Sequence, residues 1–287
     1  MPRLDDRDYN GYDYKYTIGD DIEEYLNSLP LDTEEIYIAN NDITYLPNLT
    51  RFKKLKLLNC HDNKLTRLPR LPNSLVELNC DYNKLTSLPV LPKKMNRLLC
   101  SHNKIKQLPK LPQELKILHC NHNELTCLPE LPNNLNELWC YSNILTCLPK
   151  LPNTLKTLYC NNNNITSLPI LPKKLTFLNC GENEIEYLPP LPERLSYFCY
   201  NNIPLFDVLI HNLNPMNSYP QIKKNVDILN NCRNMIYAIK FKKQFREWLW
   251  LRVREPKIKE KYHYKHLLEL DEEDNLDIFL EDWVSKE

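Results

Sequence analysis

The sequence is poor in glycine, in net charge and in long apolar runs. It has 3 Gly against 22 Pro, so we expect its turns to depend on Pro and Asn. Lys and Arg number 37, and Asp and Glu also number 37; this balance argues against a globally basic nucleic-acid-binding protein. No apolar run reaches the roughly 18 residues of a membrane-spanning helix. Residues 1–8 (MPRLDDRD) lack the apolar core of a secretion signal, so an intracellular protein is expected.

A 20-residue repeat occupies the middle of the chain. One copy, from Leu75 to Leu91, reads LVELNCDYNKLTSLPVL. Its cysteine recurs at Cys60, Cys80, Cys100, Cys120, Cys140, Cys160 and Cys180. Its central asparagine recurs at Asn63, Asn83, Asn103, Asn123, Asn143, Asn163 and Asn183. A period of this length indicates stacked repeats, each of which buries its apolar face against its neighbours.

The residue types within one repeat predict its local structure. Leucine and cysteine alternate around each Cys, which favours a short strand with both side chains inside the coil. The Leu-Pro-x-Leu-Pro return cannot be a regular helix, because its prolines lack N–H donors, and an extended polyproline-like return is expected. A buried Asn at the turn can hydrogen-bond backbone groups that would otherwise be unpaired.

The predicted fold is a solenoid of about nine repeats over residues 35–205, with a parallel β-sheet on its concave side and an extended convex side. Residues 1–34 are predicted to form an N-terminal arm and a capping helix over about 20–29, which Pro30 ends. Residues 206–287 are predicted to form an α-helical C-terminal cap and tail, because apolar residues there recur every three to four positions.

The recurring Leu, Asn and Leu-Pro positions resemble those of the leucine-rich-repeat family, in particular the 20-residue Leu-Pro-x-Leu-Pro subclass of bacterial secreted effectors. The resemblance covers about residues 34–205. It implies a curved solenoid used for protein recognition, with no enzymatic activity in the repeats.

A second resemblance concerns residues 248–270, WLWLRVREPKIKEKYHYKHLLEL. This segment is similar to a C-terminal tail of repeat proteins from giant DNA viruses of the mimivirus kind. The abundance of Asn, Lys, Ile and Tyr, with few Gly and Ala, fits an AT-rich genome. The resemblance implies a viral protein, which would act in the host cytoplasm.

Aromatic side chains gather at the outward strand positions of the later repeats. The predicted protein-binding residues are Ile117, His119, Trp139, Tyr141, Tyr159, Phe177 and Tyr197. Trp and Tyr are enriched in interface hot spots, and rows of exposed rings indicate interaction surfaces. The alternative is cross-strand stacking that only stiffens the sheet. We expect an unidentified protein partner and a monomeric chain.

Two further groups could carry chemistry. Cysteines in a single line cannot surround a metal ion tetrahedrally, so the recurring Cys is interpreted as packing. Cys127 and Cys147 lie at equivalent positions of adjacent repeats, close enough for a disulfide, although free thiols are expected in a reducing cell. His102, His119 and His122 could hold a metal, but polar surface residues are favoured because no carboxylate or Cys is fixed beside them to orient the imidazoles. No metal, cofactor or small-molecule substrate is expected.

The C-terminal region leaves alternatives open. Residues 240–265 are rich in Lys and Arg and contain Phe245, Trp248 and Trp250. They could form a basic amphipathic helix for an acidic membrane or a calmodulin-like protein, or a cap paired with the acidic residues that follow. Cys232 lacks the Cys-x-Asp motif of ubiquitin-ligase effectors and is interpreted as a packed residue.

The function predicted from the sequence is non-enzymatic protein recognition on the concave aromatic face. One alternative is a substrate adaptor in a ubiquitin-ligase pathway. The other is a scaffold that touches membrane or nucleic acid through residues 240–265, although binding of either is not expected.

Overall fold

The computed structural model describes residues 21–185 and 188–200, together with Ile228, Asn231, Lys242, Arg246 and Leu251. The chain divides into two compact units, residues 1–230 and 231–287. Apart from the five single residues, the predicted N-terminal arm, the C-terminal helices, Cys232 and the basic segment 240–265 lie outside the described residues. No helix in the described part is both long enough and apolar enough to cross a membrane.

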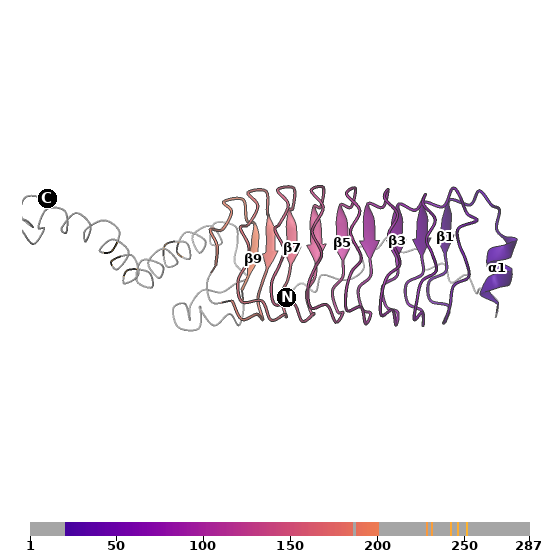
Figure 1. The fold of residues 1–287 in the computed structure, drawn as a ribbon, viewed down its shortest axis with the longest axis horizontal. Coiled ribbons are helices and arrows are strands. Elements are labelled where there is room, and N and C mark those ends of the chain that lie inside the picture. The colour runs from indigo at the N-terminus through magenta and orange to yellow at the C-terminus, as the bar shows by residue number, and fades with distance from the viewer. Residues whose placement is uncertain are drawn as a thin grey trace, which may run out of the picture. The chain divides into compact units, whose positions relative to one another are not determined.

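Nine parallel strands form one sheet and follow one another in sequence order (Figure 1). Their bounds are β1 Glu35–Tyr37, β2 Leu57–Asn59, β3 Glu77–Asn79, β4 Arg97–Leu99, β5 Ile117–His119, β6 Glu137–Trp139, β7 Thr157–Tyr159, β8 Phe177–Asn179 and β9 Tyr197–Cys199. The register follows the repeat, since Leu58 pairs with Leu78 and Leu78 with Leu98. The predicted parallel-sheet solenoid is confirmed.

Each strand is short because only its central residue and the following Cys point inward. In β3 the central Leu78 is 1% exposed and Cys80 is fully buried. The thiol of Cys80 donates to the carbonyl of Leu99 on the next coil at 3.3 Å. Burial raises the pKa of this thiol well above its ordinary value and that of Cys60 to about 12. The cysteine column therefore packs the core with protonated side chains, as predicted.

The recurring asparagine of the repeat joins the backbones of two adjacent coils. At Asn143 the Oδ1 atom accepts from the N–H of Leu125 at 3.0 Å. Its Nδ2 group donates to the carbonyls of Cys120, Cys140 and Tyr141 at 3.0, 3.1 and 3.3 Å. One side chain thus bonds backbone groups of its own coil and of the preceding coil, and it supplies the acceptor for the Leu125 N–H, which would otherwise be buried without a partner. The predicted role of this asparagine is confirmed.

The residue before each asparagine adopts a left-handed conformation although none is glycine. The φ angles are 50° at Asp62, 52° at Tyr82, 53° at His102 and 51° at His122. This conformation costs roughly 1–2 kcal/mol for a residue with a Cβ atom. The backbone N–H of Tyr82 donates to the carbonyl of Ser101 at 2.9 Å, and the same bond recurs between later coils. Inter-coil hydrogen bonds therefore hold turns that lack glycine.

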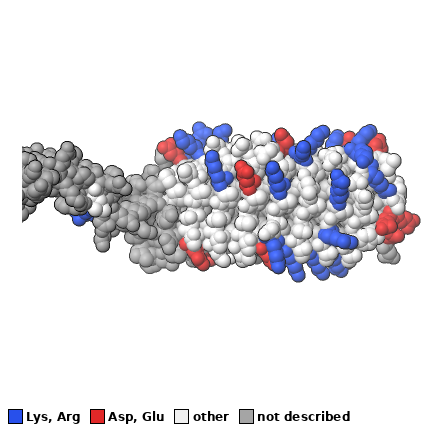
Figure 2. Space-filling view, in the orientation of Figure 1, with Lys and Arg blue, Asp and Glu red and all other residues white. Residues whose placement is uncertain are grey.

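The returns between strands are extended, as their prolines predict. Leu88 and Leu91 are buried, while Val90 between them is 87% exposed. Figure 2 shows the charged side chains in view, with Lys and Arg more numerous than Asp and Glu and gathered along both edges of the repeat region.

Helix α1, Ile22–Ser28, precedes the first strand and corresponds to the helix predicted over 20–29. Asp21 caps it by accepting the N–H of Glu23 at 2.8 Å. Ile22 and Leu26 are buried in the same apolar cluster as the strand residues. That packing supports a capping role for this helix, because the first coil has no preceding repeat to cover its apolar edge.

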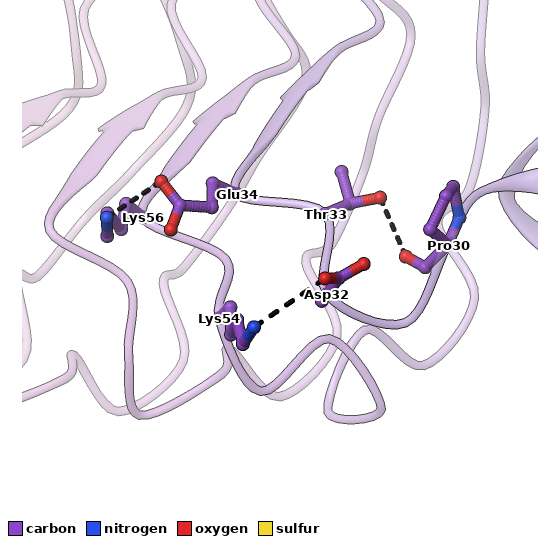
Figure 3. A network of polar contacts seen from close by, with 6 residues as sticks. All are labelled: Pro30, Asp32, Thr33, Glu34, Lys54 and Lys56. Carbon is purple, nitrogen blue, oxygen red and sulfur yellow. Dashed lines mark hydrogen bonds and ion pairs between the residues drawn. The ribbon is translucent and has the colours of Figure 1, made fainter.

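The link from α1 to β1 carries a small polar network (Figure 3). The Thr33 hydroxyl donates to the Pro30 carbonyl at 2.7 Å. Lys56 pairs with Glu34 at 2.7 Å and Lys54 with Asp32 at 3.6 Å, joining the first two coils. All four charged side chains are more than half exposed, so these pairs contribute little to stability.

Candidate protein-binding surface

The first and third residues of each strand point away from the core and form what we call the outer face of the sheet. It corresponds to the predicted concave face. From β5 to β9 its residues are Ile117, His119, Glu137, Trp139, Thr157, Tyr159, Phe177, Asn179, Tyr197 and Cys199. Six of these ten are aromatic or apolar residues from the predicted binding set, so the repeat brings them to one face.

Five rings on this face form a continuous group, which we call the strand ladder. His119 stacks on Trp139 with ring centroids 3.8 Å apart and planes 4° apart. Trp139 meets Tyr159 edge to face at 5.6 Å. Tyr197 then contacts both Tyr159 at 6.4 Å and Phe177 at 6.2 Å. The register explains the contacts, because His119, Trp139 and Tyr159 are direct partners on consecutive strands.

Stacking reduces the exposure of these rings. The prediction that all of them are exposed is wrong for His119, which is 8% exposed because the ring of Trp139 covers it. Trp139, Tyr159 and Tyr197 are half-buried, whereas Phe177 keeps 41% of its surface exposed. The ladder therefore both stiffens the sheet and leaves ring surface available to a partner.

A carboxylate lies within the strand ladder. Glu137 Oε1 is 2.9 Å from His119 Nε2, and the Glu137 side chain is 30% exposed. Burial raises the pKa of the Tyr159 hydroxyl, and the Glu137 charge raises it further. The carboxylate is therefore close to rings on both neighbouring strands, β5 and β7.

The indole nitrogen of Trp139 is buried and has no hydrogen-bond acceptor within the described part of the chain. A buried N–H without a partner costs roughly 1–3 kcal/mol. Stacking against His119 and Tyr159 offsets part of that cost, because aromatic pairs contribute beyond the area that they bury.

Tyr141 belongs to a different ring group, which we call the turn ladder. It consists of Tyr82, His102, His122 and Tyr141. Consecutive centroids lie 4.1 Å apart from Tyr82 to His102 and 4.1 Å apart from His102 to His122, with nearly parallel planes. Tyr141 meets His122 edge to face at 5.2 Å. The prediction that Tyr141 stacks with Trp139 and Tyr159 is therefore wrong, because its ring packs on the turn side.

Sequence reasoning missed the turn ladder, although rings recur immediately before Asn83, Asn103 and Asn123 and could have indicated it.

The three histidines considered as metal ligands lie in two different groups: His119 lies in the strand ladder, and His102 and His122 lie in the turn ladder. Stacked imidazoles hold their nitrogen lone pairs in parallel planes, so the two do not converge on one ion. Among the described residues, no three His, Cys, Asp or Glu side chains form a group that could hold a metal.

Two smaller features lie near these ladders. Asp81 accepts the N–H of Ser101, whose hydroxyl donates to Asn121 Oδ1 at 2.6 Å. Burial raises the pKa of Asp81 to about 7, against the lowering effects of the Ser101 hydrogen bonds and of Arg97. Asp81, Ser101 and Asn121 lie two residues after strands β3, β4 and β5, on three consecutive coils.

Cys127 and Cys147 are free and exposed. They lie on adjacent coils, which are joined near them by the bond from the Ile144 N–H to the Leu125 carbonyl at 3.1 Å. The structure therefore places them on neighbouring coils and does not join them by a disulfide.

Comparisons with known proteins agree with this architecture. A family model described as leucine-rich repeats (2 copies) matches residues 153–193. No curated protein matches the chain. YopM from Yersinia enterocolitica WA-314 is 36% identical with a TM-score of 0.59, over 61% of this chain and 39% of that one. The leucine-rich effector protein YopM from Yersinia pestis is 31% identical with a TM-score of 0.51, over 57% of this chain and 54% of that one.

The chain therefore spans less than two thirds of either YopM structure. The leucine-rich-repeat domain of a Shigella effector is 32% identical with a TM-score of 0.50, over 56% of this chain and 72% of that domain. Sequence identity over most of that domain, together with the nine-strand parallel stack, shows that this chain belongs to the leucine-rich-repeat proteins.

Proposed function

We propose that the protein is a non-enzymatic recognition module that binds a protein partner on the strand ladder of the outer face. The observation that carries the proposal is the run of rings on consecutive strands, ending in the 41% exposed Phe177. Half-buried aromatic rings offer a large, rigid contact area, which is typical of interface hot spots. The ring contacts within the ladder limit the side-chain entropy that binding would cost.

The similar structures support a role at a host–pathogen contact, since two of them are described as effectors. The Leu-Pro-x-Leu-Pro form of the repeat and the segment 248–270 support assignment to the 20-residue subclass and to a giant DNA virus. Under that assignment the protein acts in the host cytoplasm as a monomer and needs no cofactor.

The test is affinity purification from the native host cell with the full chain as bait, comparing wild type with Tyr159→Ala and Phe177→Ala. Each truncation removes ring surface from the strand ladder, so we expect the captured partner to bind at least about tenfold more weakly, as for hot-spot residues. Val90→Ala is the matched control, because Val90 is 87% exposed on the opposite, return side of the coil.

Thermal unfolding of each variant separates loss of binding from loss of fold. Unaltered affinity of the same partner for both ring variants would contradict the proposal. Equal weakening by Val90→Ala would contradict the assignment to the outer face.

A further inference from the structure

The outer face carries almost no charge from β5 to β9. Of its ten residues, which all lie in the described part of the chain, Glu137 alone bears a formal charge, and none is Lys or Arg. The neighbouring outer-face strands differ, because β3 and β4 place Glu77 directly beside Arg97. The strand ladder therefore surrounds a single carboxylate whose partner on this face is His119, with no Lys or Arg of the face beside it.

Glu137 is held in place rather than free in solvent. Its Oε1 atom lies 2.9 Å from His119 Nε2, and His119 stacks on Trp139. The side chain remains 30% exposed, so a ligand on the outer face can reach it. Lys116 and Lys156, one residue before β5 and β7, are exposed. Neither forms an ion pair with Glu137 among the pairs between described residues.

A fixed carboxylate bordered by aromatic rings is a binding site for an organic cation. Cations are attracted to the faces of Trp and Tyr rings, and a carboxylate forms charge-assisted hydrogen bonds with them. Arginine suits both contacts at once, because its planar guanidinium can stack on a ring while it donates to a carboxylate. Lysine carries a point charge on a flexible stem and can make only one of these contacts well.

We propose that the strand ladder recognises an arginine side chain of the partner protein, which pairs with Glu137 and stacks on the ring of Tyr159. This inference rests on the proposed function and names the chemistry of the partner. The occupant is a protein segment with a central arginine. An acidic or purely apolar segment is disfavoured, because it would desolvate the Glu137 carboxylate without supplying a positive charge.

The test uses fluorescent peptide pools, each of random sequence except for a fixed central residue that is arginine, citrulline or glutamate. Citrulline keeps the shape of arginine and removes its charge. Fluorescence polarisation measures the affinity of each pool for the full chain. We expect the arginine pool to bind at least about tenfold more tightly than the citrulline pool, and the glutamate pool to bind most weakly.

Two variants locate the effect. Glu137→Gln keeps an acceptor for His119 and removes the charge, so the preference for arginine over citrulline should disappear. Glu77→Gln is the matched control, since Glu77 occupies the same strand position three coils away and should leave the preference intact. Circular dichroism shows whether each variant keeps the fold.

Equal binding of the arginine and citrulline pools, absence of binding by every pool, or a preference that survives Glu137→Gln would overturn the inference. A native partner whose capture depends on Tyr159 but not on Glu137 would also overturn it, while leaving the proposed function in place. A native partner captured independently of Tyr159 and Phe177 would instead refute the proposed function.

Discussion

Replacement of Asn143 by alanine tests the interaction on which the stacking of coils depends. The side chain accepts the N–H of Leu125 at 3.0 Å and donates to the carbonyls of Cys120 and Cys140 at 3.0 and 3.1 Å. It also reaches the carbonyl of Tyr141 at 3.3 Å. Asn143 is 8% exposed, so water cannot readily replace it.

The expected loss follows from the group left behind. Asn143→Ala leaves the Leu125 N–H of the preceding coil without a partner, whereas the Cys120 carbonyl still accepts from Asn123 Nδ2 at 3.1 Å. An unsatisfied buried group costs about 1–3 kcal/mol, so the variant should lose about 1–3 kcal/mol of unfolding free energy. Domains of this kind have only about 5–15 kcal/mol in total, so the effect will be a large fraction of the stability.

Urea denaturation followed by circular dichroism measures this loss. With slopes of about 1–3 kcal/mol per molar urea, the midpoint should fall by roughly 1 M. Asn164→Ala is the control, because Asn164 is exposed and lies one residue beyond the equivalent Asn163; it should change stability by less than about 0.5 kcal/mol. A loss below about 1 kcal/mol for Asn143→Ala would refute the assignment of inter-coil stability to these bonds.

Three further predictions concern a carboxyl group, two thiols and a turn. Because burial raises the pKa of Asp81 from 3.8 to about 7, the folded state binds a proton more tightly than the unfolded state between about pH 4 and 7, and stability falls as pH rises through that window. Asp81→Asn should therefore be more stable than wild type at pH 8, by at most about 4 kcal/mol, and equally stable below pH 4. Urea denaturation at the two pH values measures this difference. A variant that is less stable than wild type at pH 8 would contradict the reasoning. Cys127 and Cys147 should react with a thiol reagent well before the fully buried cysteine column, and early labelling of that column in peptide mass spectrometry would contradict the packing. Asp62→Val should lower stability by roughly 1–2 kcal/mol because a β-branched residue disfavours a φ of 50°, whereas Asp62→Gly should be neutral or stabilising in thermal unfolding.

The repeat frame could be predicted from the sequence because its determinants are local. Alternation around Cys80 determines which side chains point inward, and the 20-residue recurrence determines which strands pair. The hydrogen bonds of Asn143 follow from the same recurrence, since a buried amide at a turn has backbone groups within reach. The proline-rich returns exclude helices by their missing donors.

The grouping of rings could not be predicted, because it depends on side-chain torsions and on which coil surface each ring covers. Tyr141 follows its strand by two residues and packs toward His122, not toward Trp139. His119 occupies an outward strand position and is nevertheless buried, because the ring of Trp139 on the next coil stacks over it. Such burial arises from a neighbour's side chain and has no periodic signal in the sequence.

The set of bonds between coils has a consequence for how such a gene can change. The repeats from Cys60 to Cys180 pack on one another through a buried Cys, an Asn amide and a left-handed turn at matching positions. An in-frame deletion or insertion of one 20-residue repeat would therefore bring together coil surfaces of the same chemistry, and the coils would still pack on one another. Recombination between repeats can change the length of this molecule without disrupting its interior, while the outward residues of each coil remain open to separate mutation and selection.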